Sequence, residues 1–341
     1  MALQLALDNL LSPPVLFFLV GILAVLLRSD LEIPDPIPKL FSLYLLWAIG
    51  YKGGVKLAEA GLTVEVMGPM VAAVALAALT PLWVNPILRL KFNPADAAAC
   101  AAAFGSVSAV TFITAANFLD AQGIPYGGHL VAALALMEAP AVVVAVLLHR
   151  RAAQAKQRQA AADNPTAGPT AGPTAENKQS MAELLREAVL SGPVYLLIGS
   201  MVVGLLAGPR GYDKLIPFTE DVFYGMLVLF LLEAGMTAAK RIKGLAEVGG
   251  FAVTISIAVP LVNALLTWGL SYVLGLAPGD AFLLMILAAS ASYIAVPATM
   301  RTAIPEANAG LYLPMALGIT FPFNIALGIP LYLWMANTIP Q

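Results

Sequence analysis

Charged and metal-binding side chains are scarce in this 341-residue sequence. Asp, Glu, Lys and Arg make up 11% of the residues, against about 25% in soluble domains, and there are two histidines and one cysteine. The lone Cys100 excludes an internal disulfide, and so few soft ligands exclude a transition-metal centre. A net charge of −2 argues against nucleic acid as a partner. No cofactor is therefore expected.

Apolar residues, by contrast, make up 60% of the chain. They gather in runs of about 17–25 residues, the length that crosses a bilayer as a helix. The sequence therefore predicts an all-α polytopic membrane protein with membrane lipid around it. The ten predicted transmembrane helices lie near residues 13–28, 39–58, 65–84, 95–118, 128–149, 189–207, 219–239, 249–274, 279–300 and 309–335.

The ten spans fall into two similar halves, residues 1–149 and 188–341, joined by residues 150–187. The joining segment passes from a basic stretch into TAGP repeats that cannot bury a core, so we expect a flexible linker. PADAAACAAAFGSVSAVT at 94–111 is echoed by PGDAFLLMILAASASYIA at 278–295, 184 residues later. Chance similarity of apolar sequence inflates such matches, but their shared order favours duplication. Because each half has an odd number of spans, the pattern predicts two inverted five-helix repeats.

Both halves carry a Ser-x-Ser pair inside an apolar run, Ser106 with Ser108 and Ser290 with Ser292. In a regular helix, residues i and i+2 point about 200° apart, so both hydroxyls line one pocket only if the helix unwinds. A single pair more often reflects close helix packing. Two pairs at matched positions favour broken, crossing helices whose hydroxyls and free backbone N–H groups bind a small planar oxyanion.

Glu138, in MEAPA, is predicted to lie near the depth of the serines and precedes Pro140, which is expected to break the helix. Because Na⁺ prefers hard oxygen ligands, we expect Glu138 to help bind a coupling sodium ion. A protonated Glu138 bonded to a neighbouring helix is the alternative. Thr320 is its rough counterpart in the second half. The predicted sodium ligands are Ser108, Glu138, Ser292 and Thr320.

Other polar residues of the spans have structural interpretations. Glu233 is expected to pair with another helix or to face water, and Asn263 to bond across helices. Asp96 and Asp280 stand at span starts, where a carboxylate caps the helix and suits its positive end. Residues expected to surround the site without binding directly are Thr111, Thr114, Asn117 and Asn324.

The distribution of positive charge predicts the orientation. The ten-span model puts fourteen Lys and Arg side chains on the linker side and four, Lys52, Lys56, Arg210 and Lys214, on the other. Since segments rich in Lys and Arg stay in the cytoplasm, the linker is predicted to be cytoplasmic and both termini outside.

Five motifs resemble those of the sodium-dependent bicarbonate permeases first known from cyanobacteria. They are IGYKGG at 49–54, FGSVSA at 104–109, MEAPA at 137–141, SGPV at 191–194 and ASASYIAVPATMRTAIPEAN at 289–308. The resemblance covers nearly the whole chain apart from the linker. It implies homotrimers in a bacterial inner membrane and, in cyanobacterial members, inhibition by a small PII-like protein from the cytoplasm.

The resemblance also implies that the protein has two domains. A gate domain would comprise 13–60 plus 189–243, and a core domain 64–149 plus 248–336, with the substrate site where the broken helices meet. By position, it assigns substrate binding to Gly105, Ser106, Val107, Ser108, Ser290, Ala291 and Ser292.

At three positions the chain departs from the cyanobacterial type. Glu138 stands where the family usually has Asp, and Ala109 stands where it has glycine. Tyr293 follows Ser292, where the family has a serine run that ends in Asp. These departures bear on sodium coupling and on the choice of anion.

Together these features predict a secondary transporter and not an enzyme. It takes up a small anion, for which bicarbonate is the leading candidate, and couples this uptake to sodium by alternating access. The alternatives are a cation/proton antiporter with Glu138 as the proton carrier and a sodium-coupled symporter of another small organic anion. An intramembrane serine protease would need a base beside its serine, and His129 and His149 fall at span ends. A channel or receptor-like sensor stays open, because binding geometry does not prove turnover.

Overall fold

The structure is a computed structural model that describes residues 7–34, 36–61, 63–163, 186, 190, 192–242 and 245–340. Every regular element in this part of the chain is helical. The predicted flexible linker falls largely on residues outside the described ones. The helices are α2 (Pro13–Leu26), α3 (Pro36–Ala60), α4 (Val64–Leu88), α5 (Pro94–Gly105), α6 (Ala109–Gln122), α7 (His129–Asp163), α9 (Gly192–Tyr212), η2 (Pro217–Asp221), α10 (Val222–Ile242), α11 (Leu245–Leu274), α12 (Pro278–Ala289), α13 (Ala295–Ala303), α14 (Ala309–Leu313), η3 (Pro314–Thr320), α15 (Phe321–Phe323), η4 (Asn324–Gly328) and α16 (Ile329–Ala336).

Each of the ten predicted spans coincides with helical structure, although not every helix meets the length and hydropathy of a membrane span. Within the described residues, seven helical segments are long and apolar enough to cross a membrane. They are Val66–Leu88, Pro94–Gln122, His129–Ala155, Gly192–Tyr212, Pro217–Arg241, Gly249–Leu274 and Ala309–Ala336. The segments Pro13–Leu26 and Pro278–Ala289 are apolar but shorter. The chain is thus an all-helical protein with several candidate membrane helices.

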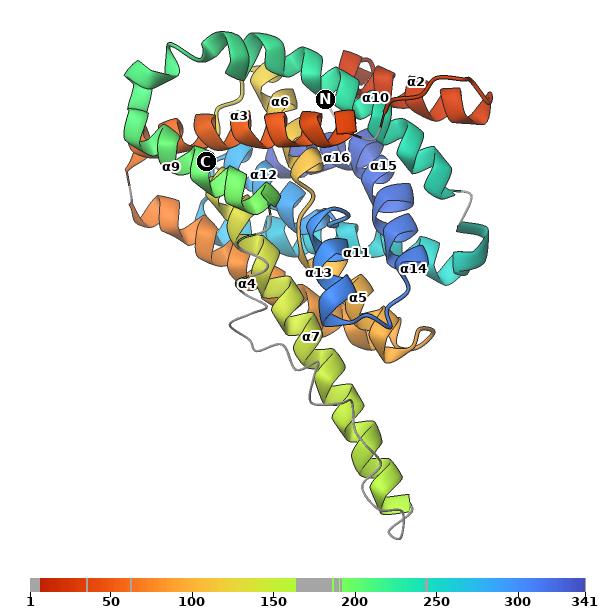
Figure 1. The fold of residues 1–341 in the computed structure, drawn as a ribbon. Coiled ribbons are helices and arrows are strands. Elements are labelled where there is room, and N and C mark those ends of the chain that lie inside the picture. The colour runs from red at the N-terminus through yellow and green to blue at the C-terminus, as the bar shows by residue number, and fades with distance from the viewer. Residues whose placement is uncertain are drawn as a thin grey trace.

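Four helices form one layer of the molecule, above α4, α5, α11 and α14 in Figure 1: α3 packs along α9, and α2 along α10. Glycine permits both close contacts, since a Cβ atom at Gly54 would lie 2.0 Å from the carbonyl oxygen of Met201, and one at Gly235 would lie 2.1 Å from that of Phe18. Gly54 and Gly235 stand 181 residues apart, close to the spacing of the two halves. The two close contacts therefore lie at corresponding positions of the two similar halves of the sequence.

The fifth predicted span is continuous. α7 runs from His129 to Asp163 with Pro140 inside it, so the prediction that Pro140 breaks this helix is wrong. Proline is tolerated inside membrane helices because neighbouring helices and local adjustments satisfy the freed carbonyl. The same holds in α4, which contains Pro69, Pro81 and Pro86. Figure 1 shows the end of α7, beyond the predicted boundary at 149, projecting from the body of the molecule.

Asp96 and Asp280 join the two halves instead of capping their own helices. The cap of α5 is Asn93, whose side chain accepts a hydrogen bond from the Asp96 N–H. The Asp96 carboxylate accepts from the backbone N–H of Asn308 at 2.7 Å, and that of Asp280 accepts from Gly127 N–H at 2.6 Å. The capping prediction is therefore wrong, although both carboxylates lie in the first helical turn, where the helix dipole favours them.

Candidate functional site

Two helices are interrupted where the sequence predicts. α5 ends at Gly105 and α6 begins at Ala109, with Ser106 and Ser108 in extended conformations. α12 ends at Ala289 and α13 begins at Ala295, and Ser290 is again extended. Unwinding thus frees both Ser-x-Ser pairs from the helical geometry that would point their hydroxyls apart.

The two breaks touch each other through backbone groups. Ser292 N–H donates to the carbonyl oxygen of Ala103 at 2.8 Å. In the other direction, Ser108 N–H donates to Ser290 Oγ at 2.9 Å, and that hydroxyl donates to the carbonyl oxygen of Leu287 at 3.0 Å. Leu287 stands 184 residues after Ala103, and Ser292 stands 184 residues after Ser108, so the two contacts join corresponding residues. The difference is that Ser292 N–H bonds directly to a carbonyl oxygen, whereas Ser108 N–H reaches its carbonyl oxygen through the Ser290 hydroxyl. The matched segments of the two halves therefore meet nearly symmetrically.

A carboxylate supports the first break. Ser106 Oγ donates to Glu138 Oε2 at 2.9 Å, which ties α7 to the segment between α5 and α6. Ser108 caps α6, because its Oγ accepts from the N–H of Thr111 at 3.2 Å and from the Thr111 hydroxyl at 2.9 Å. The predicted proximity of Glu138 to the serines is thus seen directly.

Amide side chains support the second break. Asn263 Nδ2 donates to the carbonyl oxygen of Ala288, and Asn324 Nδ2 to that of Ala289, both at 2.8 Å. These are carbonyls of the last turn of α12, which an interrupted helix leaves without N–H partners. Ser292 Oγ accepts from the N–H of Val296 at 3.4 Å, at the start of α13. Asn263 has the cross-helix role predicted for it.

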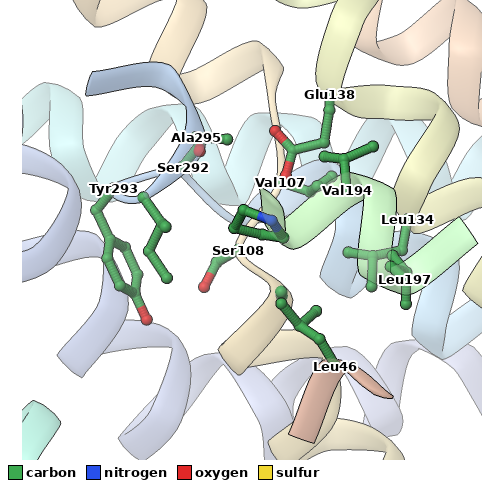
Figure 2. Close-up of a pocket in the computed structure, with 13 residues that line it drawn as sticks. Leu46, Val107, Ser108, Leu134, Glu138, Val194, Leu197, Ser292, Tyr293 and Ala295 are labelled. Atoms are coloured by element: carbon green, nitrogen blue, oxygen red, sulfur yellow. The ribbon is translucent and has the colours of Figure 1, made fainter. Parts of the chain in front are cut away.

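A small cavity of about 20 Å³ lies where the breaks face α3 and α9. That is room for about one water molecule or a bare cation. Figure 2 shows polar groups of Ser108, Glu138, Ser292 and Tyr293 around it, with apolar side chains opposite. The apolar part of the lining includes Leu46, Val107, Leu134, Val194 and Leu197.

The predicted site residues separate into those that line this cavity and those behind it. Val107, Ser108, Glu138 and Ser292 line it. Ser106 and Ser290 are buried and engaged in the hydrogen bonds above, and Gly105 and Ala291 are buried beside them.

Some candidates lie elsewhere. Thr320 is fully buried, and its hydroxyl donates to the carbonyl oxygen of Ser256 at 2.7 Å, so the structure does not bring it to the cavity. Thr114 likewise bonds back to Val110 at 2.9 Å. Glu233 accepts a hydrogen bond from Thr237 at 2.6 Å and faces a second, larger cavity. Glu233 was predicted either to pair with another helix or to face water, and its position in the wall of this cavity agrees with the second prediction.

That larger cavity has a volume of about 940 Å³ and is called the vestibule here. Its wall carries the cations Lys39, Arg241 and Arg301. Pro193, Tyr293 and Ile294 line both the vestibule and the small cavity, so the two cavities adjoin at these residues. The vestibule therefore leads to the breaks from one side.

A third cavity of about 270 Å³ has Asn117 in its wall and is crossed by ion pairs. Lys52 Nζ, on α3, lies 3.0 Å from Asp120 Oδ2 at the end of α6 and 3.3 Å from Glu220 Oε1 in η2. The sequence analysis used Lys52 as part of a motif and as an orientation charge but not as a paired residue, although a lysine inside an apolar run already indicates a buried or paired cation. The pair with Asp120 joins α3 to the layer that holds the breaks, and the pair with Glu220 joins α3 to the segment before α10.

Neither histidine is placed to activate a serine. His129 Nε2 lies 3.7 Å from Asp280 Oδ2, and His149 Nε2 lies 2.9 Å from Glu306 Oε1. Ser106, meanwhile, donates its hydroxyl proton to a carboxylate. Across the described residues, the arrangement of nucleophile and base that a serine protease requires is not formed.

The family model described as the Na⁺-dependent bicarbonate transporter superfamily matches residues 13–337 of the chain. The match extends from the start of α2 to just beyond α16, so both breaks, Glu138 and all three cavities fall inside it. None of the individual curated proteins compared with the chain matches it. The resemblance seen in the sequence motifs is confirmed.

Proposed function

This chain belongs to the Na⁺-dependent bicarbonate transporter superfamily, and from that premise we propose that it takes up bicarbonate together with Na⁺ as a secondary transporter. One observation carries the proposal. The two helix breaks meet at a small cavity that has serine hydroxyls and a carboxylate in its wall. Such a site binds ions and contains no activated nucleophile, which agrees with transport and not with an enzymatic reaction.

The anion is held by donors that the breaks expose. N–H groups in the first turns of α6 and α13 have no acceptors within their own helices. They stand beside Ser108 and Ser292, at the positive ends of the helix dipoles. A small planar oxyanion matches this combination of directed N–H and O–H groups without any buried lysine or arginine.

The sodium ion is held in the small cavity, which has room for one cation, and the anion is held beside it at the boundary with the vestibule. Glu138 supplies a carboxylate, and Ser108 and Ser292 supply hydroxyls, which are hard ligands suited to Na⁺. The charges of the carboxylate and the anion are then partly balanced by the cation. Binding of each ion therefore favours binding of the other, which couples the two fluxes.

Transport itself is a movement of the layer that contains the breaks against the layer of α2, α3, α9 and α10. The vestibule opens toward the site on one side, and the Lys52 ion pairs close the other. The vestibule cations Lys39, Arg241 and Arg301 all belong to the side predicted to be cytoplasmic, and Lys52 belongs to the opposite side. This conformation thus corresponds to a state that faces the cytoplasm.

The rest of the proposal concerns topology and assembly. It comprises ten membrane spans in two inverted repeats, both termini outside a bacterial inner membrane, and a homotrimer. A PII-like cytoplasmic regulator is the proposed protein partner. The motif resemblance supports these parts, and the contacts of Asp96 and Asp280 at corresponding positions of the two halves add support for the repeats alone.

The decisive experiment measures uptake of labelled bicarbonate into proteoliposomes with and without an inward Na⁺ gradient. We expect gradient-driven uptake in the wild type and its loss in Ser108→Ala combined with Ser292→Ala. Ser271→Ala is the matched control, because Ser271 is a buried serine of α11 whose hydroxyl has no partner in the described part of the chain. A pH-sensitive dye inside the vesicles separates symport from proton antiport.

Each outcome bears on a different part of the proposal. Equal uptake by the double mutant and the wild type contradicts the site. Uptake that ignores the Na⁺ gradient but acidifies or alkalinises the lumen supports the antiporter. Na⁺-driven uptake of formate or acetate in place of bicarbonate keeps the mechanism and changes the substrate. Uptake that does not saturate indicates a channel.

A further inference from the structure

The second helix break is longer than the first. α6 begins at Ala109, directly after Ser108, whereas α13 begins only at Ala295, so Tyr293 and Ile294 remain outside the helix. Tyr293 stands 184 residues after Ala109, which makes the two residues counterparts. One break therefore carries a large aromatic side chain where the other carries a methyl group.

Tyr293 lies at the boundary between the small cavity and the vestibule, since it lines both. Its ring packs edge-on against Phe321, with centroids 5.5 Å apart and planes at 66°. Phe321 in turn packs edge-on against Phe18 of α2, also at 5.5 Å. This aromatic chain fixes the ring in place. An anion that passes between vestibule and site must pass Tyr293.

The hydroxyl of Tyr293 is buried beside Ser108, whose hydroxyl can donate to it, but within the described residues no acceptor completes a hydrogen bond with the Tyr293 proton. Figure 2 shows it on the same side of the cavity as Ser108. The nearby hydroxyls have other partners, since Ser108 accepts from Thr111 and Ser290 donates to Leu287. A buried donor without an acceptor is costly, and such groups in native proteins usually await a water, ion or ligand.

We propose that Tyr293 is the residue that determines which anion the site accepts. Its hydroxyl donates a hydrogen bond to one oxygen of the bound anion, and its ring limits the length of the anion on the vestibule side. The class selected is the small planar oxyanion with a single central atom, such as bicarbonate, formate or nitrate. This inference rests on the proposed transport function and deepens it.

Removal of the hydroxyl alone tests the first half of the inference. In Tyr293→Phe we expect the KM for bicarbonate uptake to rise about 10-fold, because one hydrogen bond to a charged ligand is lost, while the dependence on Na⁺ at saturating bicarbonate stays unchanged. Tyr312→Phe removes the same group from a buried tyrosine of α14 that lies outside the cavity lining, and its kinetics should match the wild type. An unchanged KM in Tyr293→Phe overturns the hydrogen bond, and a change confined to the Na⁺ dependence makes the hydroxyl a sodium ligand instead.

Removal of the ring tests the second half. In Tyr293→Ala we expect propionate to compete with bicarbonate uptake, whereas it should not compete in the wild type or in Tyr293→Phe. Equal exclusion of propionate by all three proteins overturns the role of the ring. Thermal unfolding in detergent shows whether the Ala variant is folded; if it is not, Tyr293→Leu repeats the test with more of the volume kept.

Binding measurements separate this inference from the transport proposal. Calorimetric titration of the purified protein with bicarbonate, formate and nitrate needs no flux. Weaker binding by Tyr293→Phe, combined with wild-type protein that binds but does not transport, supports the role of Tyr293 and contradicts the transport function. If the wild type transports bicarbonate but binds it no more tightly than Tyr293→Phe does, the transport function is supported and the role of Tyr293 is contradicted. Absence of binding of all three anions to the wild type contradicts both.

Discussion

The two helix breaks share their serines but differ in what holds them and in what they present. The first is short, is capped by Ser108, and is tied by Ser106 to Glu138. The second is longer, has its carbonyls satisfied by Asn263 and Asn324, and presents Tyr293. Similar backbones thus place hydroxyls near one cavity, while residues that differ between the halves add a negative charge on one side and a neutral donor on the other.

The helices that follow the breaks end in different surroundings as well. α6 ends near Asp120, which pairs with Lys52 of α3. α13 carries Arg301 in its last turn, and this side chain faces the vestibule. The first break therefore leads to the ion pairs of Lys52 and the second to the vestibule. The predictions below test this contrast, from the largest expected effect to the smallest.

Removal of the negative charge of Glu138, which supports the first break, should have the largest effect on uptake. In Glu138→Gln the Ser106 hydroxyl keeps an acceptor, but the cavity loses its carboxylate, so Na⁺-driven uptake should fall about 100-fold. The comparison variant is Glu233→Gln, which neutralises the carboxylate that faces the vestibule and should change uptake less than about 3-fold. Both are measured as initial rates across a range of Na⁺ concentrations. Retained Na⁺ dependence in Glu138→Gln contradicts its role as a ligand.

Loss of a supporting amide should destabilise the second break more than loss of a cap destabilises the first. Asn324→Ala leaves the buried Ala289 carbonyl unpaired and should lower the free energy of unfolding by about 2 kcal/mol. Ser108→Ala removes an N-cap, which costs about 1 kcal/mol. Thermal unfolding in detergent measures both changes. The opposite order would show that the first break is the more strained one.

Gly105 and Ala289 are the last residues of α5 and α12, and exchange of each for the other's residue type should affect stability and uptake strongly only at Gly105. A Cβ atom at Gly105 would lie 2.7 Å from the Pro81 ring and 3.0 Å from the Ala141 Cβ, so Gly105→Ala should cost about 1.5 kcal/mol by overpacking and should slow uptake. Ala289, the counterpart, tolerates Gly at a cost of about 1 kcal/mol from helix propensity alone. If Gly105→Ala and Ala289→Gly slow uptake equally, the tight packing at Gly105 does not distinguish the first break from the second.

Release of the closed side should have the smallest effect. Lys52 is partly exposed, and such ion pairs contribute about 0.2–1 kcal/mol, so Lys52→Gln should raise the accessibility of a cysteine at position 117 by about 2- to 5-fold. The assay is labelling of Asn117→Cys with a membrane-impermeant maleimide, with Lys214→Gln as the control from the same predicted side. Unchanged labelling in Lys52→Gln would mean that the ion pairs do not hold this side closed.

Several parts of the site were predictable because they depend on local sequence. The interruption of an apolar helix by Ser-x-Ser, and the choice of Ser106 and Ser108 with Ser290 and Ser292, follow from spacing alone. Glu138 was identifiable because a carboxylate in an apolar run is rarely without a function. These features depend on residue type and position along the chain.

Other parts were not predictable because they depend on which segments meet. Asp96 and Asp280 have the composition of helix caps, yet their partners Asn308 and Gly127 lie in the opposite half. Thr320 matches Glu138 in order but bonds to Ser256 instead of the site. Pro140 looked like a helix breaker, but the packing around α7 accommodates it. In each case a distant neighbour overrode the local preference.

By itself, the sequence determined that the chain is an apolar helical protein and that two similar segments carry Ser-x-Ser pairs inside apolar runs, because hydropathy and spacing act along the chain. Only the tertiary structure decided which of those groups share a cavity, which residues form ion pairs with Lys52, and that no acceptor in the described part of the chain completes a hydrogen bond with the Tyr293 proton. The reason is that hydrogen-bond partners and cavity walls come from residues far apart in sequence, so they are set by the packing of whole helices.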